Sequence, residues 1–314
     1  MNEMMQLARE TTWNRFGRRI TFYLPGMFAC NWTFGRYPGV SITGAECSLR
    51  CKHCRGKVLL SMLEAREPDM LVKRCIELDK KGNLGVLLSG GSDQRGCLPW
   101  AKFIPAIGEI KARTGLKVSI HSGFIDRATA LGLKDAGVDQ ALIDVIGDDE
   151  TWWEISHIKS GVARLLDSLE ALGTAGIPIV PHLVCGLYYG NIRAEANAIE
   201  IISRLNVRLL VMVSLMTIPG TPLWGLAPPP AQEVARLTAE ARLRMPDTEI
   251  SLGCARQRGN ADLETLAIDA GVSRMALPSE AAIERAEYYG LEIRYQRTCC
   301  SVSEGIYESE WIVP

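Results

Sequence analysis

The sequence has no long apolar run and no excess of charge of either sign. No apolar run reaches the ~18 residues that a membrane span requires, and residues 1–19 lack the uninterrupted apolar core of a signal peptide. Lys and Arg number 35 against 36 Asp and Glu, which argues against a general polyanion-binding protein. We therefore expect a cytoplasmic protein that binds neither membranes nor nucleic acid.

The composition also lacks the polar bias of a disordered chain. Hydrophobic residues make up 47% and charged residues 23% of the 314 residues, which is typical of globular proteins. That length suffices for one large α/β barrel or for two ordinary domains. Cysteine, in contrast, is plentiful, with 10 residues. In a reducing compartment cysteines are expected to be metal ligands, catalytic thiols or core residues rather than disulfides.

Short apolar, β-branched runs alternate with stretches of helical spacing from about residue 40 almost to the end of the chain. Strands are predicted at Val40–Thr43, Gly85–Ser89, Leu116–His121, Gln140–Ile146, Ile177–Cys185, Arg208–Leu215, Glu249–Cys254 and Ser273–Leu277. Eight strands separated by helices imply a parallel sheet with right-handed crossovers, and the size matches a TIM-type (β/α)8 barrel. A doubly wound open sheet is the alternative. The predicted organisation is an N-terminal extension over 1–39, a barrel over 40–290 and a C-terminal tail over 291–314.

Three cysteines follow the first predicted strand, at the C-terminal face where barrel enzymes carry their chemistry. Cys47, Cys51 and Cys54 lie within eight residues in the spacing C-x3-C-x2-C. Three thiolates so close together can hold one face of an iron–sulfur cluster, and a [4Fe-4S] cluster with three protein ligands leaves one iron open. A zinc site completed by His53 and buried core cysteines are the alternatives. Zinc sites usually pair two C-x2-C-type knuckles, and no second knuckle follows.

This loop and its surroundings resemble the radical SAM superfamily over roughly residues 20–280. The resemblance implies a [4Fe-4S] cluster on the three cysteines, whose open iron chelates S-adenosylmethionine. His53 stands where the family usually has an aromatic residue near the adenine. Ser89, Gly90 and Gly91 resemble the family's glycine motif after strand two, whose backbone meets the methionyl amino group, because glycine lets ligand atoms reach the main chain.

Within the superfamily, the sequence resembles the biotin synthase branch. Gly220–Leu223 is similar to the loop after strand six of that branch, and Ile250–Arg256 is similar to its strand seven. The resemblance places Asp144 on the ribose hydroxyls of S-adenosylmethionine, where a carboxylate can accept from two vicinal hydroxyls. A helix N-cap or a solvated loop residue is the alternative for this aspartate. Arg164 lies close to a family arginine that pairs with the methionyl carboxylate.

Three further cysteines are candidate ligands of an auxiliary iron–sulfur cluster at the barrel mouth. They are Cys254, at the end of the seventh predicted strand, and the adjacent pair Cys299 and Cys300 in the tail. Adjacent cysteines do not easily form a relaxed disulfide, which favours a metal or partner role, although packing in a C-terminal core is the alternative. In an extended backbone the two adjacent side chains are expected to diverge. Arg256 or Arg258 is placed to offset the negative charge of such a cluster.

The segments Leu24–Phe28 and Cys54–Lys57, together with the Cys-Cys tail, resemble the archaeal-type two-protein lipoyl synthases, nearer to the second of the two proteins. This resemblance implies a radical SAM sulfurtransferase that inserts sulfur into an octanoyl chain on an octanoylated carrier protein or lipoyl domain. It also implies a partner radical SAM protein and an electron donor such as ferredoxin or flavodoxin. Another biotin-synthase-like radical SAM enzyme (maturase, mutase or methylase) and a non-redox metal-binding barrel are the alternatives.

Overall fold

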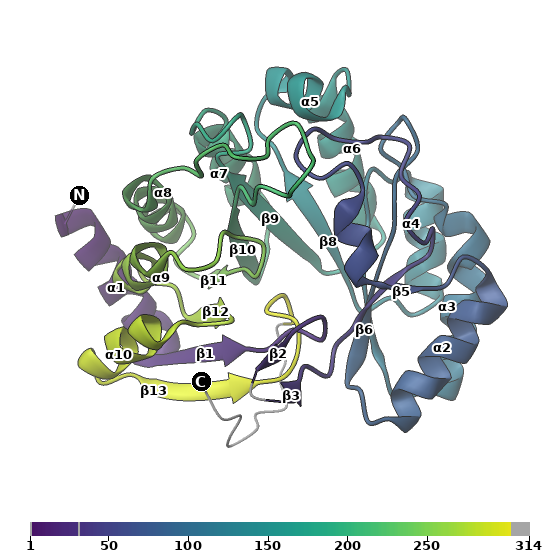
Figure 1. Ribbon diagram of the computed structural model, residues 1–314, viewed down its shortest axis with the longest axis horizontal. Coiled ribbons are helices and arrows are strands. Elements are labelled where there is room, and N and C mark those ends of the chain that lie inside the picture. The colour runs from purple at the N-terminus through teal and green to yellow at the C-terminus, as the bar shows by residue number, and fades with distance from the viewer. Residues whose placement is uncertain (1, 31, 303–314) are drawn as a thin grey trace.

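The computed structural model describes residues 2–30 and 32–302, which form a curled parallel sheet with helices on its outer side (Figure 1). In this part of the chain the sheet has 11 strands in the order β13-β1-β12-β11-β10-β9-β8-β7-β6-β4-β5. These strands are β1 (Arg19–Tyr23), β4 (Gly39–Ser41), β5 (Leu63–Glu64), β6 (Gly85–Ser89), β7 (Lys117–His121), β8 (Gln140–Val145), β9 (Ile179–Cys185), β10 (Leu209–Ser214), β11 (Glu249–Leu252), β12 (Arg274–Ala276) and β13 (Glu292–Gln296).

The crossovers between strands are mostly helical, and a short hairpin precedes β4. The helices are α1 (Asn2–Phe16), α2 (Pro68–Lys80), α3 (Trp100–Arg113), α4 (Arg127–Asp135), α5 (Asp149–Ser156), α6 (Gly161–Thr174), α7 (Glu195–Ser203), α8 (Ala231–Arg244), α9 (Ala261–Asp269) and α10 (Glu280–Tyr288). The hairpin pairs β2 (Ala29–Cys30) with β3 (Thr33–Phe34), and the 3-10 helix η1 (Lys57–Ser61) follows the cysteine loop. No helix in residues 2–30 and 32–302 is both long and apolar enough to cross a membrane.

The eight strands predicted from the sequence are present as β4 and β6 to β12, which confirms the α/β class and the parallel sheet. The sheet is a curled half-barrel that also includes β1 and β13, which the apolar pattern does not predict. Tyr23 of β1 is paired with Ala276 of β12 and with Gln296 of β13. The two ends of the sheet, β13 and β5, are not paired with each other. Near this gap, the Arg36 amide donates to the carbonyl oxygen of Arg297 at 2.6 Å.

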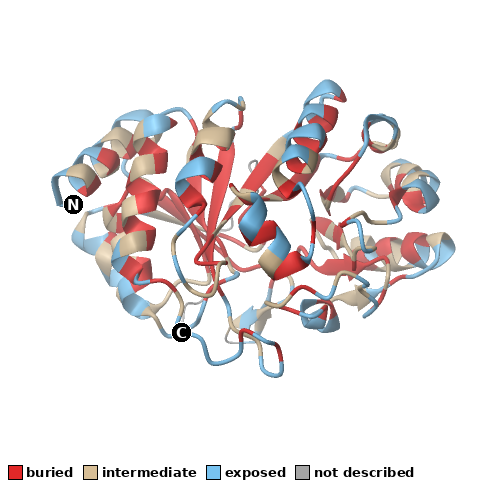
Figure 2. Cartoon of the chain, turned by 90° about the horizontal axis from the view of Figure 1, so that it is seen from above, coloured by how far each residue is buried: buried red, intermediate tan, exposed pale blue. Residues whose placement is uncertain are grey.

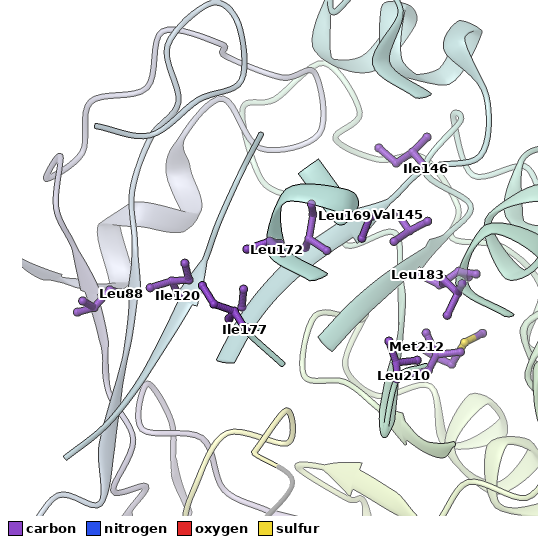
Figure 3. Packing of buried hydrophobic residues seen from close by; sticks show 14 of the residues in the cluster. Leu88, Ile120, Val145, Ile146, Leu169, Leu172, Ile177, Leu183, Leu210 and Met212 are labelled. Carbon is purple, nitrogen blue, oxygen red and sulfur yellow. The ribbon is translucent and has the colours of Figure 1, made fainter. Parts of the chain in front are cut away.

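Two apolar layers hold the sheet in place. Leu88, Ile120, Leu183 and Met212 are buried in the layer between the strands and the helices (Figure 3), and each fully buried side chain of this kind contributes about 1.5–3 kcal/mol. The helices are buried toward the sheet and exposed on the opposite side (Figure 2). Several helices begin at side-chain caps, such as Asp126, which accepts from the amide of Thr129 before α4 and so satisfies a free backbone donor.

The second apolar layer lies inside the curled sheet and includes the end of the described chain. Inward residues such as Leu142, Val211 and Val213 pack with Cys299 and Cys300. The segment after β13 therefore turns into the space that the sheet encloses (Figure 1). This path brings the tail cysteines beside the strand ends where the other candidate residues lie.

Candidate functional site

A cavity of about 420 Å³ lies at the C-terminal ends of the strands, and both groups of cysteines line it. We call Cys47, Cys51 and Cys54 the loop cysteines. The second cysteine group consists of Cys254, Cys299 and Cys300. The other sequence-predicted site residues that line the same cavity are His53, Ser89, Gly90 and Asp144. One cavity thus unites residues from β6, β8, the cysteine loop, the end of β11 and the tail.

The cysteine loop is held against the end of β6 by close backbone contacts. The amide of Ser48 donates to the carbonyl oxygen of Ser92 at 2.9 Å. A Cβ atom on Gly91 would lie 1.9 Å from the carbonyl oxygen of Glu46 and 2.5 Å from the Cα of Cys47. Glycine is therefore required at position 91 because the cysteine loop itself approaches the backbone there. The expected contact between the backbone of this glycine motif and the methionyl amino group stays a prediction.

Two of the loop cysteines, Cys51 and Cys54, are in a setting that disfavours their ionisation unless a cation is bound. Burial, with smaller contributions from the neighbouring Cys54 and Cys47, outweighs a hydrogen bond with Ser156 and raises the pKa of the Cys51 thiol to about 12. Burial also raises the pKa of Cys54. Three thiolates so close together need positive charge among them, which bound iron supplies.

The ligand geometry favours a multi-iron cluster over a single metal ion. In residues 2–30 and 32–302, no three His, Cys, Asp or Glu side chains converge closely enough to hold one metal ion. The zinc alternative, with His53 completing the three thiols, lacks the convergent ligands that tetrahedral zinc requires, whereas cluster ligands bind different iron atoms. His53 lines the cavity and its buried Nδ1 has no hydrogen-bond partner in the protein. That atom is free to bond a ligand in the cavity.

A carboxylate and two imidazoles form a polar wall of the same cavity. His121 ends β7, Asp144 is near the end of β8, and His182 lies beside Asp144 on β9. The Nε2 of His121 lies 3.5 Å from Oδ1 of Asp144, and the rings of His121 and His182 are perpendicular with centroids 6.0 Å apart. Burial raises the pKa of Asp144, but the histidines outweigh it and lower the pKa to about 2. Asp144 is therefore an ionised acceptor, as the proposed contact with ribose hydroxyls requires.

Two residues lie differently from the sequence-based expectation. His182 lines the cavity but is not predicted, and Arg164 is predicted at the site but does not line the cavity. His182 could have been found from its inward register on β9, between Val180 and Val184. The Arg164 guanidinium instead lies 4.5 Å from the ring centre of Phe124 and donates to the Cys97 thiol at 3.7 Å. Phe124 lines the cavity, so its ring stands between Arg164 and the cavity. The structure therefore does not bring Arg164 to the site.

The second cysteine group is gathered by a turn in the tail. The amide of Val302 donates to the carbonyl oxygen of Cys299 at 3.0 Å, so the pair lies in a tight turn rather than in extended backbone. The two adjacent side chains do not diverge as expected, because the Cys300 thiol hydrogen-bonds to Cys299. That bond, opposed by burial and aided by Ser301 and Arg274, lowers the pKa of Cys299 to about 6. Burial, together with the neighbouring Cys299, raises the pKa of Cys254 to about 11.

The fold and the cavity define a class of protein: a parallel α/β half-barrel with three closely spaced loop cysteines at its strand ends, which could hold an iron–sulfur cluster. Comparison with known families supports this class. Residues 41–194 match the radical SAM superfamily, and residues 210–310 match the Biotin and Thiamin Synthesis associated domain. The chain belongs to the biotin-synthase-like branch of the radical SAM superfamily.

Curated relatives support the same relationship, and solved structures share the fold. Biotin synthase of Acidithiobacillus ferrooxidans is 27% identical over 244 residues, which cover 76% of each chain. Biotin synthase of Alkalilimnicola ehrlichii is 25% identical and covers 74% of this chain and 72% of its own. Among solved structures, methylornithine synthase matches with a TM-score of 0.63 and 16% identity, covering 93% of this chain and 88% of its own. The FeFe-hydrogenase maturase HydG of Carboxydothermus hydrogenoformans matches with a TM-score of 0.67 and 15% identity, covering 95% of this chain and 73% of its own.

The family indicates which cofactors the protein uses. They are a [4Fe-4S] cluster and S-adenosylmethionine, and an auxiliary iron–sulfur cluster is typical of biotin synthases. The loop cysteines fit the first cluster because three thiols face the cavity from one short loop. The unpartnered His53 nitrogen and the ionised Asp144 offer polar contacts to the sulfonium ligand beside it.

Proposed function

We propose that the protein is a radical sulfur-insertion enzyme that acts on an unactivated carbon of an octanoyl chain. The observation that carries this proposal is the second cysteine group, which shares one cavity with the loop cysteines. The chemistry supplied by the bound cofactors is a 5′-deoxyadenosyl radical from S-adenosylmethionine at the first cluster and a sulfur atom from the second. The protein holds the two cofactors on either side of the substrate and keeps water away.

The lining of the cavity suits an aliphatic chain. Beyond its cysteines and its polar wall, the cavity is lined by apolar side chains of β8, β9 and β10 and of the loop that follows β10, including Leu142, Val184, Val213, Leu215 and Met216. An alkyl chain that leaves water for such a surface gains about 0.8 kcal/mol for each buried methylene. A lysine-linked octanoyl group on a carrier protein or lipoyl domain has both the apolar length and the reach to enter from the strand ends.

We propose the partners from the same resemblance to the two-protein lipoyl synthases. Lipoyl formation requires sulfur at two carbons, so a second radical SAM protein would supply the other insertion. A ferredoxin or flavodoxin would reduce the first cluster. All ten cysteines of the chain are free thiols, which suits the reducing cytoplasm.

Anaerobic reconstitution with iron and sulfide counting tests the proposal. The triple variant Cys254→Ala, Cys299→Ala and Cys300→Ala should lose about half of its iron, the share of one cluster in two. It should still form 5′-deoxyadenosine but no carbon–sulfur bond on an octanoylated peptide. Cys75→Ala is the matched control, because this thiol is buried on α2 and does not line the cavity. Wild-type iron content in the triple variant would instead favour a maturase, mutase or methylase.

A further inference from the structure

The tail does more than approach the barrel mouth, because its last described residues lie inside the barrel. We call residues 299–302 the C-terminal turn. Cys300 is 2% exposed, Ser301 0% and Val302 4%. The turn packs among inward apolar residues of the strands, Val211 among them. A peptide segment in this position lies off the strand ladders, so its buried backbone oxygens need other hydrogen-bond donors.

Two inward side chains supply those donors. Gln140, at the start of β8, donates from Nε2 to the carbonyl oxygen of Ser301 at 3.0 Å. Arg274, at the start of β12, donates from Nη2 to the carbonyl oxygen of Cys300 at 3.2 Å and also to that of Val302. The two strands are four places apart in the sheet order. Three successive carbonyl oxygens of the turn are therefore bonded from separate parts of the barrel wall.

Arg274 is itself held rigidly. Its Nη1 lies 2.9 Å from Oε2 of Glu249 on the neighbouring strand β11, and its guanidinium lies 4.7 Å from the ring centre of Tyr23 on β1. The side chain is only 4% exposed. A buried guanidinium is stable only when it is paired and hydrogen-bonded. Arg274 meets this condition by bonding the C-terminal turn, so the arginine and the turn depend on each other.

The C-terminal turn also divides the interior of the barrel. Cys299 and Cys300 line the cavity at the C-terminal ends of the strands. Val302 lines a second cavity, of about 670 Å³, at the N-terminal ends of β7 to β10, together with Gln140 and Leu209. The C-terminal turn thus lies between the cavity at the C-terminal ends of the strands and the cavity at their N-terminal ends, and it separates the two.

We infer that Arg274 and Gln140 are positioning residues that hold the C-terminal turn inside the barrel and set where Cys299 and Cys300 face the cavity. The positioning itself follows from the contacts of the turn. Its consequence for the auxiliary cluster rests on the proposed function. Arg274 and Gln140 act through the backbone of the turn rather than on substrate or cofactor.

Thiol accessibility in the full-length, cluster-free protein tests the inference. In Arg274→Gln, a bulky maleimide–polyethylene glycol reagent should label Cys299 and Cys300 about tenfold faster or more, as expected when hydrogen bonds from a charged group are lost. Labelling is assigned by peptide mass spectrometry. Cys75, which is fully buried on α2, should react at the wild-type rate, since it reports only global unfolding.

Arg242→Gln is the matched control. Arg242 is a fully buried arginine that also donates to backbone carbonyl oxygens, including that of Thr248 at 2.6 Å, but it does not contact the turn. Its loss should leave the labelling of Cys299 and Cys300 unchanged relative to Cys75. If these two thiols stay as protected in Arg274→Gln as in the wild type, the inference is wrong. If Cys75 of Arg274→Gln is labelled faster to the same degree as Cys299 and Cys300, that variant is globally unfolded. The labelling of the tail thiols relative to Cys75 is then compared in Gln140→Ala, and the inference is wrong if the tail thiols stay protected there.

Iron counting separates this inference from the proposed function. In reconstituted Arg274→Gln we expect the auxiliary iron to fall while 5′-deoxyadenosine formation persists. Faster labelling of the tail thiols, in a protein whose wild type holds only one cluster, would support the positioning role and overturn the proposed function. If the wild type holds two clusters but the tail thiols of Arg274→Gln are labelled no faster, the positioning role is wrong and the proposed function is supported.

Discussion

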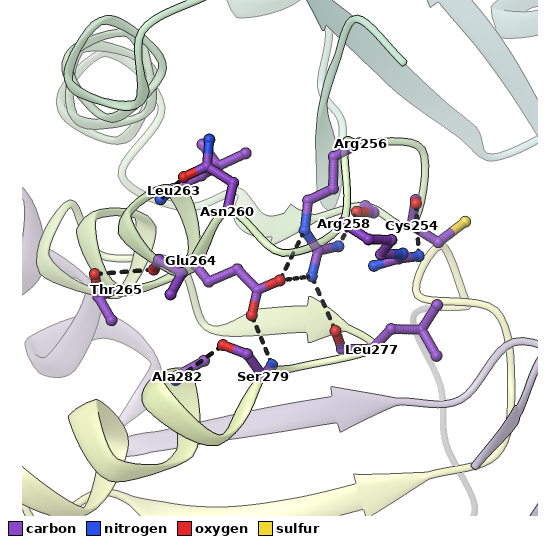
Figure 4. A network of polar contacts seen from close by, with 12 residues as sticks. Cys254, Arg256, Arg258, Asn260, Leu263, Glu264, Thr265, Leu277, Ser279 and Ala282 are labelled. Carbon is purple, nitrogen blue, oxygen red and sulfur yellow. Dashed lines mark hydrogen bonds and ion pairs between the residues drawn. The ribbon is translucent and has the colours of Figure 1, made fainter. Parts of the chain in front are cut away.

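The Nη2 of Arg256 lies 2.7 Å from Oε1 of Glu264, and both side chains are buried, with exposures of 0% and 5%. The same guanidinium donates to the carbonyl oxygen of Gly253 at 2.5 Å, and Glu264 accepts from the amide of Ser279 at 2.6 Å (Figure 4). One ion pair thus ties the end of β11 to α9 and to the start of α10. Cys254 lies within this tied segment, so its position in the cavity depends on the pair.

Removing one partner of this pair should destabilise the fold. Glu264→Gln leaves the Arg256 guanidinium buried without a counter-ion, and we expect the free energy of unfolding to fall by about 3–5 kcal/mol. Urea denaturation measures this change. The matched control is Glu109→Gln, which breaks the exposed ion pair with Arg113 on α3 and should leave the midpoint near that of the wild type. Equal midpoints for the two variants would contradict a structural role for the buried pair.

Gly91→Ala should prevent the cysteine loop from closing. The added Cβ would lie 1.9 Å from the carbonyl oxygen of Glu46, so the loop must move away from β6 and the iron content after reconstitution should drop sharply. Gly108→Ala is the control because a Cβ there meets nothing within 4 Å on α3. It should keep its iron and gain about 0.5–1 kcal/mol of stability. Normal iron content in Gly91→Ala would mean that the loop tolerates the shift.

Asp144→Asn should change the titration of His121. Burial lowers the pKa of His121, but the Asp144 carboxylate outweighs burial and raises the pKa above its usual value. Without that charge the pKa should fall below the usual value, which imidazole NMR signals report. Because the folded-state pKa of His121 is raised and that of Asp144 is lowered, the pair stabilises the wild type fully between about pH 4 and about pH 6.5. This advantage should disappear as the pH rises through the folded-state pKa of His121, and an advantage that grew with pH would contradict the pairing.

Asp144→Ala should also weaken the binding of S-adenosylmethionine. If the carboxylate accepts from the ribose hydroxyls, the loss should be about 1.5–3 kcal/mol, the range for hydrogen bonds to charged groups. Calorimetry on the reconstituted protein measures this, and iron content should not change. Asp167→Asn, an exposed aspartate on α6, is the control and should bind normally. Unaltered affinity in Asp144→Ala would leave the aspartate as a partner of His121 alone.

Local patterns predict much of this fold because parallel strands that are buried on both faces are continuous apolar runs, as in Leu209–Ser214 of β10. β13 (Glu292–Gln296) is not predicted in this way, because it is an edge strand with a largely polar sequence and no continuous apolar run. The loop cysteines are likewise predictable, since their spacing alone places three thiols together. Cys254 and the tail pair are also expected to meet at the barrel mouth, but no local pattern predicts how they meet, because this depends on a turn held by strands that are distant in sequence.

The loop cysteines themselves give the most decisive prediction. Changing Cys47, Cys51 or Cys54 singly to Ala should abolish 5′-deoxyadenosine formation under dithionite, since three protein thiolates are required to hold the cluster while one iron stays open. Product is measured by liquid chromatography of anaerobic reactions. Cys97→Ala is the matched control, because this half-buried thiol follows β6 and contacts Arg164 outside the cavity.

The control should retain cleavage near the wild-type rate, which would show that loss of a thiol near β6 is not in itself damaging. The other thiols of the chain lie outside the loop, Cys254, Cys299 and Cys300 in the second cysteine group among them, so we do not expect them to replace a loop cysteine. A single loop variant that still cleaves S-adenosylmethionine at near the wild-type rate would therefore move the first cluster away from this loop. It would also remove the reason to place the substrate between the loop cysteines and the C-terminal turn.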